Sequence, residues 1–166
     1  MRKEIKVAIL TISDKASAGK RKDKSGPIID SLVKNIKAKV LCREIIPDNK
    51  KTIEKKLKIL ADELKIDLIL TTGGTGFSAR DVTPEATRAV IEKEIPGIPE
   101  AMRIKSLKFT LKAMLSRSIA GIRGKTLIIN LPGSSVAVKE CLDIILPVIP
   151  HAVELLQGKG GECGRR

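Results

Sequence analysis

A glycine-dense stretch at residues 71–81, TTGGTGFSARD, combines the residue types that bind phosphate groups. Gly73, Gly74 and Gly76 carry no Cβ, so the backbone there can adopt positive φ and bring bare N–H groups close to an anion. Four hydroxyl side chains in the same stretch can donate further hydrogen bonds, namely Thr71, Thr72, Thr75 and Ser78. A tight turn that binds nothing is the alternative interpretation. The number of donors gathered here favours a phosphate-binding turn.

Three aspartates, Asp14, Asp48 and Asp81, follow apolar runs or candidate turns. Each of them alone is typical of a turn or a helix cap. Three carboxylates beside a phosphate-binding turn are better explained by Mg²⁺, a hard cation held by one or two carboxylates together with phosphate oxygens. Arg80 and nearby lysines could offset the remaining phosphate charge.

The single histidine, His151, lies far in sequence from the glycine turn, where a packing or surface role is the simpler interpretation. The sequence indicates neither a Ser-His-Asp nor a Cys-His arrangement. A phosphate monoester has a second pKa of about 6, so it is largely dianionic at neutral pH and needs no general base to act as a nucleophile. The residues therefore favour phosphoryl or nucleotidyl transfer onto a phosphate, achieved by alignment and charge neutralisation.

An alternation of apolar strands and amphipathic helices must position these residues. The predicted strands are mostly apolar and cover residues 6–13, 40–46, 67–72 and 126–131. Helices are predicted over residues 27–37, 52–64 and about 135–157, and the last is bent or restarted by Pro147 and Pro150. Another helix is predicted to begin with Thr83 as N-cap and Pro84 at its first position. This alternation predicts an α/β fold, a three-layer α/β/α sandwich around a mostly parallel sheet.

The carboxyl ends of the predicted parallel strands should meet at one edge of the sheet, where ligands bind in folds of this kind. That edge would gather residues 13–14, 47–48, 72–81 and 130–134. The candidate phosphate-binding and carboxylate residues are therefore expected to form one site.

Composition sets the class of protein. The 166 residues suggest one domain over residues 1–158 and a mobile tail over 159–166. The chain has no Trp or Tyr and only two Phe, so its core should be aliphatic. A net charge of +13 fits a lysine-rich surface, a funnel for a polyanionic small molecule, or nucleic-acid binding. Nucleic acid is the least favoured partner, because aromatic stacking platforms and known binding motifs are absent.

Targeting and redox signals are weak in this sequence. Three cysteines without a CxxC spacing, beside one histidine, argue against a zinc site and a disulfide framework. No run approaches the roughly 18 apolar residues of a membrane span, and residues 1–4 show no signal-peptide plan. We therefore expect a cytoplasmic protein that does not engage a membrane.

The stretch TTGGTGFSARDVTPEAT at 71–87 resembles the signature of the MogA/MoaB family of molybdenum cofactor biosynthesis, which includes the G domains of gephyrin and its plant counterpart. The resemblance continues in family order along nearly the whole chain. Its other segments are SDKASAGKRKDKSGP at 13–27, IPD at 46–48, IPGIPEAMR at 95–103, SLKFTLKAMLSRSIAGIRGKTLIINLPGS at 106–134 and ECLDIILPVIPHAVELLQG at 140–158.

The resemblance implies a molybdopterin adenylyltransferase, in which the terminal phosphate of molybdopterin attacks the α-phosphorus of ATP in the presence of Mg²⁺. Adenylyl-molybdopterin and pyrophosphate would be the products. Asp48 and Asp81 match the two aspartates that the family needs, and would be catalytic and hold the metal. The implied substrate contacts are Ser13, Asp14, Thr72, Gly73, Gly74, Thr75, Gly76 and Ser106, with Asn130, Pro132, Gly133 and Ser134 as a further wall of the pocket.

The resemblance also implies a homotrimer and a possible transfer of product to a MoeA-like molybdenum-insertion protein. The competing function is that of a MoaB-like molybdopterin-binding protein or carrier without adenylyltransferase activity. Such a protein would keep the glycine turn but tolerate the loss of Asp48 or Asp81. Because both aspartates are present, the sequence favours the enzyme.

Overall fold

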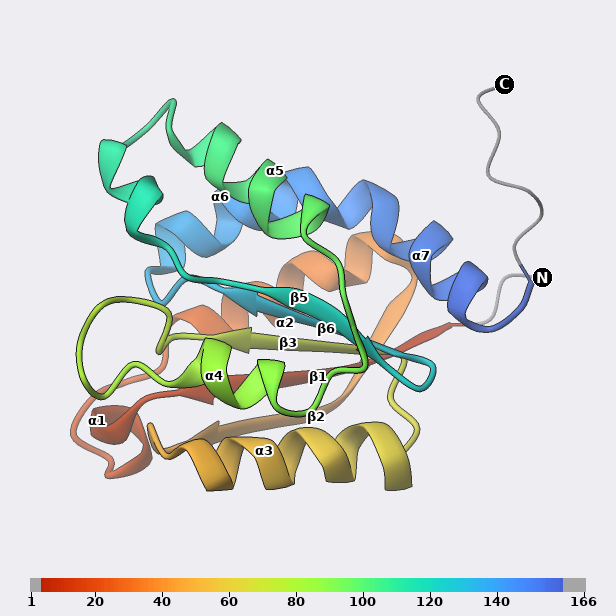
Figure 1. The fold of residues 1–166 in the computed structure, drawn as a ribbon, viewed down its shortest axis with the longest axis horizontal. Coiled ribbons are helices and arrows are strands. Elements are labelled where there is room, and N and C mark those ends of the chain that lie inside the picture. The colour runs from red at the N-terminus through yellow and green to blue at the C-terminus, as the bar shows by residue number, and fades with distance from the viewer. Residues whose placement is uncertain (1–3, 160–166) are drawn as a thin grey trace.

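A computed structural model describes residues 4–159, and within them six strands form one sheet in the order β2-β1-β3-β6-β5-β4 (Figure 1). Four strands are parallel, and their bounds are Ile5–Ile12 for β1, Ala38–Ile46 for β2, Leu68–Thr72 for β3 and Thr126–Leu131 for β6. Two short antiparallel strands that the sequence did not predict extend the sheet, β5 at Ala120–Arg123 and β4 at Lys93–Glu94. The prediction of a mostly parallel α/β sheet is confirmed.

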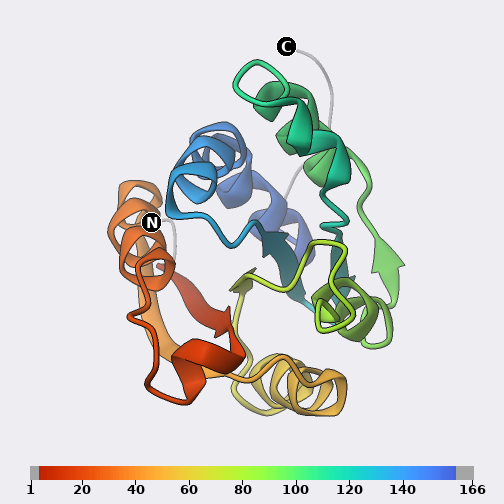
Figure 2. The ribbon, with the colours of Figure 1, turned by 90° about the vertical axis from the view of Figure 1, so that its left-hand side faces the viewer.

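Helices cover both faces of this sheet, as the view in Figure 2 shows. One face carries α2 (Ser25–Val33), α5 (Gly97–Ser106), α6 (Ser135–Ile145) and α7 (Ile149–Leu156). The other carries α3 (Lys50–Lys58), which continues as a π-helical turn at Ile59–Glu63, and α4 (Thr83–Arg88). Shorter elements are α1 (Asp14–Ser17) and 3₁₀ turns at Lys34–Ile36, Leu111–Leu115 and Leu146–Val148. The predicted three-layer sandwich is confirmed.

Side-chain alternation along the strands divides the core into two apolar clusters, one on each face of the sheet. On β1, Val7 and Ile9 belong to the cluster under α2 and α6, whereas Ala8 and Leu10 belong to the cluster under α3 and α4. The largest fully buried side chains are isoleucines and leucines, so the predicted aliphatic core is also confirmed.

The prolines of the last predicted helix restart it, as expected. Pro147 lies in the first turn of the 3₁₀ segment that follows α6, and Pro150 lies in the first turn of α7. A proline is tolerated there because the first N–H groups of a helix have no partner inside the helix.

The prediction that Thr83 is the N-cap of α4 is wrong. Val82 occupies that position without a side-chain capping bond, and Thr83 is the first residue inside the helix. Its hydroxyl donates to the carbonyl oxygen of Gly73 at 2.9 Å. Thr83 therefore fastens the glycine turn to α4.

The described part of the chain ends three residues after α7, at Lys159. Gly158 has a positive φ of 73°, and its N–H donates to the carbonyl of Leu155, which closes α7. Apart from Lys159, the predicted mobile tail lies outside the described residues. Across residues 4–159, every helix is too short or too polar to cross a membrane.

Candidate functional site

The carboxyl ends of β1, β2, β3 and β6 lie at one edge of the sheet, because Thr11 pairs with Thr72, Ile12 with Ile46 and Thr72 with Leu131. A cleft of about 700 Å³ opens at this edge, and we call it the glycine cleft. The predicted site residues that line it are Ser13, Asp48, Thr72, Gly73, Gly74, Asp81, Gly133 and Ser134. The convergence predicted from the strand ends is therefore present in the fold.

A second hollow of about 390 Å³ is lined by the residues that follow Gly74 in the glycine turn, and we call it the apolar pocket. Four other predicted residues line it, namely Thr75, Gly76, Ser106 and Pro132. Its wall also contains Phe77, Met102, Leu115 and Cys141. The glycine turn and the segment 132–134 each contribute to both hollows, so the predicted site is divided between a polar and an apolar compartment.

The glycine turn approaches its neighbours too closely for a side chain. Gly73 has φ +96°, and a Cβ added there would lie 2.4 Å from the carbonyl oxygen of Ile12. Gly74 has φ +66°, and its added Cβ would lie 2.3 Å from the hydroxyl of Thr83. Within the described part of the chain, the N–H groups of Gly74, Thr75 and Gly76 have no hydrogen-bond acceptor. These free donors are what an anion-binding turn requires.

Asp14 and Asp48 lock two loops together through reciprocal bonds. The Asp14 N–H donates to Asp48 Oδ2 at 2.8 Å, and the Asp48 N–H donates to Asp14 Oδ1 at 3.0 Å. Arg80 also binds Asp14, donating from Nε and Nη2 to Asp14 Oδ2 at 2.9 and 2.7 Å. This guanidinium holds the pKa of Asp14 below its ordinary value. Asp14 thus supports Asp48 and binds Arg80. It is not among the residues that line either hollow, so the substrate contact predicted for it stays a prediction.

Asp48 and Asp81 both face the glycine cleft. Burial raises the pKa of Asp48, and the negative charges of Asp14 and Asp81 add to that rise. Asp81 accepts a bond from the Ser78 N–H at its Oδ2, at 2.8 Å. Among the described residues no group of three or more carboxylate, cysteine or histidine side chains is placed to hold a metal ion. A divalent cation bound in the cleft could take oxygen ligands from Asp48 and Asp81, with its other positions filled by phosphate oxygens of a substrate.

The family model described as "probable molybdopterin binding domain" matches residues 8–151, which include the glycine turn and all three aspartates. The chain belongs to this family. This confirms the family membership that the sequence resemblance predicted.

Relatives of this chain align with almost its whole length. A molybdopterin adenylyltransferase of Helicobacter pylori is 46% identical over 156 residues, which cover 93% of this chain and 89% of the relative. The molybdopterin adenylyltransferase of Escherichia coli K12 is 39% identical over 168 residues, covering 93% and 86%. The crystal structure of the molybdopterin biosynthesis enzyme MoaB from Thermus thermophilus superposes with a TM-score of 0.89 at 46% identity, covering 95% and 99%.

Asn130 lines neither hollow, which corrects the prediction that it forms a wall of the pocket. The side chain is fully buried, and its amide donates to the hydroxyls of Thr71 at 3.0 Å and Thr87 at 2.9 Å. Its Oδ1 accepts the N–H of Ile119 at 3.3 Å. Asn130 therefore joins β6 to β3, α4 and the start of β5 beneath the site.

A basic loop contributes to the glycine cleft, although the sequence did not assign its residues to the site. Arg21, Lys22 and Lys24 line the cleft together with Asp23. Asp23 Oδ1 accepts the N–H groups of Ser25 and Gly26, both at 3.0 Å, and so fixes the loop to the start of α2. The sequence signal that could have identified this loop is the density of basic residues between 20 and 24, but that density alone indicates only a solvated loop.

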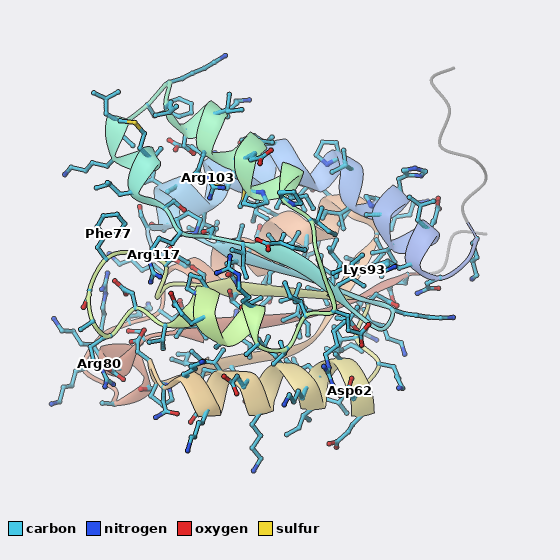
Figure 3. The ribbon with its side chains drawn as sticks, in the orientation of Figure 1. Asp62, Phe77, Arg80, Lys93, Arg103 and Arg117 are labelled. Atoms are coloured by element: carbon cyan, nitrogen blue, oxygen red, sulfur yellow. The ribbon has the colours of Figure 1, made fainter. Side chains whose placement is uncertain are left out.

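Arg117 was also missed. It donates to the carbonyl oxygens of Gly76 at 2.7 Å and Asp81 at 2.8 Å, and it pairs with the carboxylate of Glu85. Figure 3 labels Arg117 on the same side of the molecule as Phe77 and Arg80. No local pattern could reveal these contacts, because the partners lie more than 30 residues away along the chain.

Replacing Asp48 with Asn is expected to raise the free energy of unfolding slightly at pH 7. Because the pKa of Asp48 is raised in the folded chain, its ionised form lowers stability above that pKa, and the penalty disappears at lower pH. Asparagine never ionises, and its carbonyl oxygen can still accept the Asp14 N–H. Urea unfolding at several pH values should show a gain at pH 7 that vanishes below the ordinary Asp pKa of about 3.9.

Asp14→Asn is the matched control for that experiment, and its effect on the free energy of unfolding at pH 7 should have the opposite sign. The pKa of Asp14 is lowered, so its ionised form adds stability at neutral pH, and that contribution is lost as the pH falls through the folded pKa. A loss of stability at pH 7 in both variants would contradict the assignment for Asp48.

Proposed function

We propose that this chain transfers AMP from ATP to the terminal phosphate of molybdopterin. The observation that carries the proposal is the pairing of Asp48 and Asp81 with the free backbone N–H of Gly74 in the glycine cleft. The next two residues of the turn, Thr75 and Gly76, present their free N–H groups beside the apolar pocket. Relatives named molybdopterin adenylyltransferase, at 39–46% identity over most of the chain, support the same activity.

The chemistry requires little proton transfer. An oxygen of the terminal phosphate of molybdopterin forms a new bond to the α-phosphorus of ATP. The bond from that phosphorus to the oxygen bridging to the β-phosphate breaks, and pyrophosphate leaves with its electron pair. The free N–H of Gly74 would donate a hydrogen bond to the phosphates, and the side chains of Arg21, Lys22 and Lys24 would offset their charge.

The carboxylates supply the metal site in this proposal. Asp48 and Asp81 would hold Mg²⁺ together with phosphate oxygens, and the cation would stabilise charge on the reacting phosphates. Both side chains are already fixed, Asp48 by the Asp14 N–H and Asp81 by the Ser78 N–H. The chain thus presents its two anionic ligands at defined places before substrate binds.

The two hollows suit different parts of the substrates. The glycine cleft, with Ser13, Gly133, Ser134 and the basic loop, would hold phosphate groups. The apolar pocket, lined by Thr75, Gly76, Ser106 and Pro132 beside Met102, would hold a planar ring with few polar contacts.

The experiment that tests the activity is mass spectrometry of the purified protein incubated with molybdopterin and ATP, with and without Mg²⁺. Adenylyl-molybdopterin and pyrophosphate that form only with Mg²⁺ are expected. Tight molybdopterin binding without product would instead support the MoaB-like carrier.

A homotrimer is part of this proposal. Large apolar side chains on α5 and the segment that follows it are exposed, and such a surface is typical of a protein contact. They are Ile104, Leu107, Phe109, Leu111, Met114 and Leu115. We infer that a second copy of the chain covers this surface.

Light scattering is expected to give three times the chain mass of 18.0 kDa for the wild type. Leu111→Glu should shift the protein toward the monomer, because Leu111 is 72% exposed in the single chain and a buried carboxylate would be costly. Leu41→Glu on β2, where the leucine is 51% exposed, should leave the mass unchanged. Dissociation of the Leu41 variant alone would place the interface elsewhere.

We further propose that the protein acts in the cytoplasm, without a membrane or nucleic-acid partner, and passes its product to a MoeA-like molybdenum-insertion protein. Oligonucleotide binding that weakens steeply with salt, in a protein with no affinity for molybdopterin, would contradict this assignment of partners.

A further inference from the structure

The loop at residues 76–81 carries Asp81, and the side chain of Arg117 bonds to its base. Arg117 Nε donates to the carbonyl of Gly76 at 2.7 Å, and Nη2 donates to the carbonyl of Asp81 at 2.8 Å. The backbone N–H of Arg117 also donates to the carbonyl of Thr75 at 3.1 Å. A single residue therefore bonds to both ends of the loop.

The other contacts of Asp81 lie within the loop itself. Its carboxylate accepts the Ser78 N–H, and its own N–H donates to the Ser78 carbonyl at 2.9 Å. These bonds fix the shape of the loop but not its place on the sheet. At the tip, Arg80 pairs with Asp14, but this pair is exposed and water weakens such pairs strongly. The place of Asp81 in the cleft thus depends on the base of the loop.

The charge of Arg117 is already matched. Its Nη1 pairs with the carboxylate of Glu85, in the first turn of α4. Burial acts to raise the pKa of Glu85, but the hydrogen bond and charge of Arg117 outweigh it, and the pKa lies below its ordinary value. Arg117 is not among the described residues that line either hollow. These observations argue against a direct contact between Arg117 and a substrate phosphate.

Only arginine can make this set of bonds. The guanidinium presents five N–H groups in a rigid plane, whereas a lysine ammonium is a single flexible point of donation. Here three of its nitrogens reach three separate acceptors on the loop and α4.

We propose that Arg117 is a positioning residue that sets the place of Asp81 in the glycine cleft without touching substrate. The proposal rests on the proposed AMP transfer, in which Asp81 holds the reacting phosphates through a cation. Displacing such a group by about 1 Å can cost about 10²-fold in rate.

The test is the steady-state kinetics of Arg117→Ala, measured with and without added guanidinium ion at concentrations that leave the wild type folded. We expect kcat to fall by about 10–100-fold while the KM values for ATP and molybdopterin stay close to wild type. Guanidinium should restore part of kcat by binding in the space left by the side chain.

Arg123→Ala is the matched control. Arg123 forms a similar fork far from the site, donating from Nε and Nη2 to Asp62 and from Nη1 to the carbonyl of Val90 at 2.9 Å. Its loss should lower stability and leave kcat unchanged, with no response to guanidinium. A raised KM with normal kcat in Arg117→Ala would overturn the proposal in favour of substrate binding. Equal losses of kcat in both variants, neither restored by guanidinium, would reduce Arg117 to a general structural role.

Hydrogen exchange separates this proposal from the proposed function. In the milder variant Arg117→Lys, the backbone amide of residue 117, which donates to the carbonyl of Thr75 at the base of the loop, should lose protection relative to the wild type, whereas amides of α6 should not change. Unchanged protection of that amide would overturn the positioning role even in an active enzyme. A wild type that forms no adenylyl-molybdopterin would refute the function, while the exchange result would still decide whether Arg117 holds the loop.

Discussion

Asp81→Asn is expected to lower kcat for AMP transfer by about 10²–10³-fold while molybdopterin affinity stays close to that of the wild type. The substitution barely changes shape, and the asparagine carbonyl oxygen can accept the Ser78 N–H that Asp81 Oδ2 now accepts at 2.8 Å. The loop should therefore keep its conformation. What is removed is the negative charge that faces the cleft, where the proposed cation stabilises the reacting phosphates.

Asp67→Asn provides the control for that result. Asp67 precedes β3 at the opposite end of the strand and, like Asp81, accepts a backbone N–H, in this case from Lys6 at 2.9 Å. Its replacement should leave turnover per folded molecule unchanged. If Asp81→Asn weakened molybdopterin binding as much as turnover, the aspartate would be a substrate contact and the metal role would fail.

Gly73→Ala is expected to lower the free energy of unfolding by about 2–5 kcal/mol and to remove most activity. The residue has φ +96°, outside the range that alanine adopts easily, and the new Cβ would meet the carbonyl oxygen of Ile12 at 2.4 Å. That oxygen belongs to the end of β1, which cannot move without displacing Ser13 and the cleft wall. Urea unfolding and the mass-spectrometric assay measure the two effects.

The contrast is with Gly124→Ala, in the turn between β5 and β6. Gly124 also has positive φ, at 55°, but nothing lies within 4 Å of its added Cβ. Only backbone strain should remain, about 1–2 kcal/mol, and turnover should not change. Equal losses at the two glycines would show that close approach to β1 is not what makes Gly73 necessary.

The parts of the fold that the sequence predicted are those with a clear apolar pattern. β1, β3 and β6 are almost entirely buried, whereas β2 is an edge strand whose residues alternate between exposed and partly buried, and both patterns identify a strand. β4 has only two residues and β5 only four, and their pairing depends on contacts with each other and with β6. A segment that becomes a strand only through its neighbours leaves no local signal.

The site was predictable to the extent that strand ends decide it. Asp48 and Asp81 come together because parallel strands end at one edge, and that argument needs no side-chain detail. The same argument failed for Asn130, because position near a strand end does not tell which way a side chain points. Arg117 was beyond such reasoning, since its role comes from three acceptors on a distant loop and helix.

The division of the glycine turn between two hollows has a consequence for inhibition. Gly74 lines one compartment and Thr75, its neighbour in the chain, lines the other. A compound that joins an anionic group to a flat apolar group through a short linker over this peptide would engage both compartments at once. Its second half would bind at the high effective concentration set by the linker, so its affinity would far exceed that of either fragment. The two fragments, offered separately, would occupy the protein together without competing with each other, whereas the joined compound would compete with both.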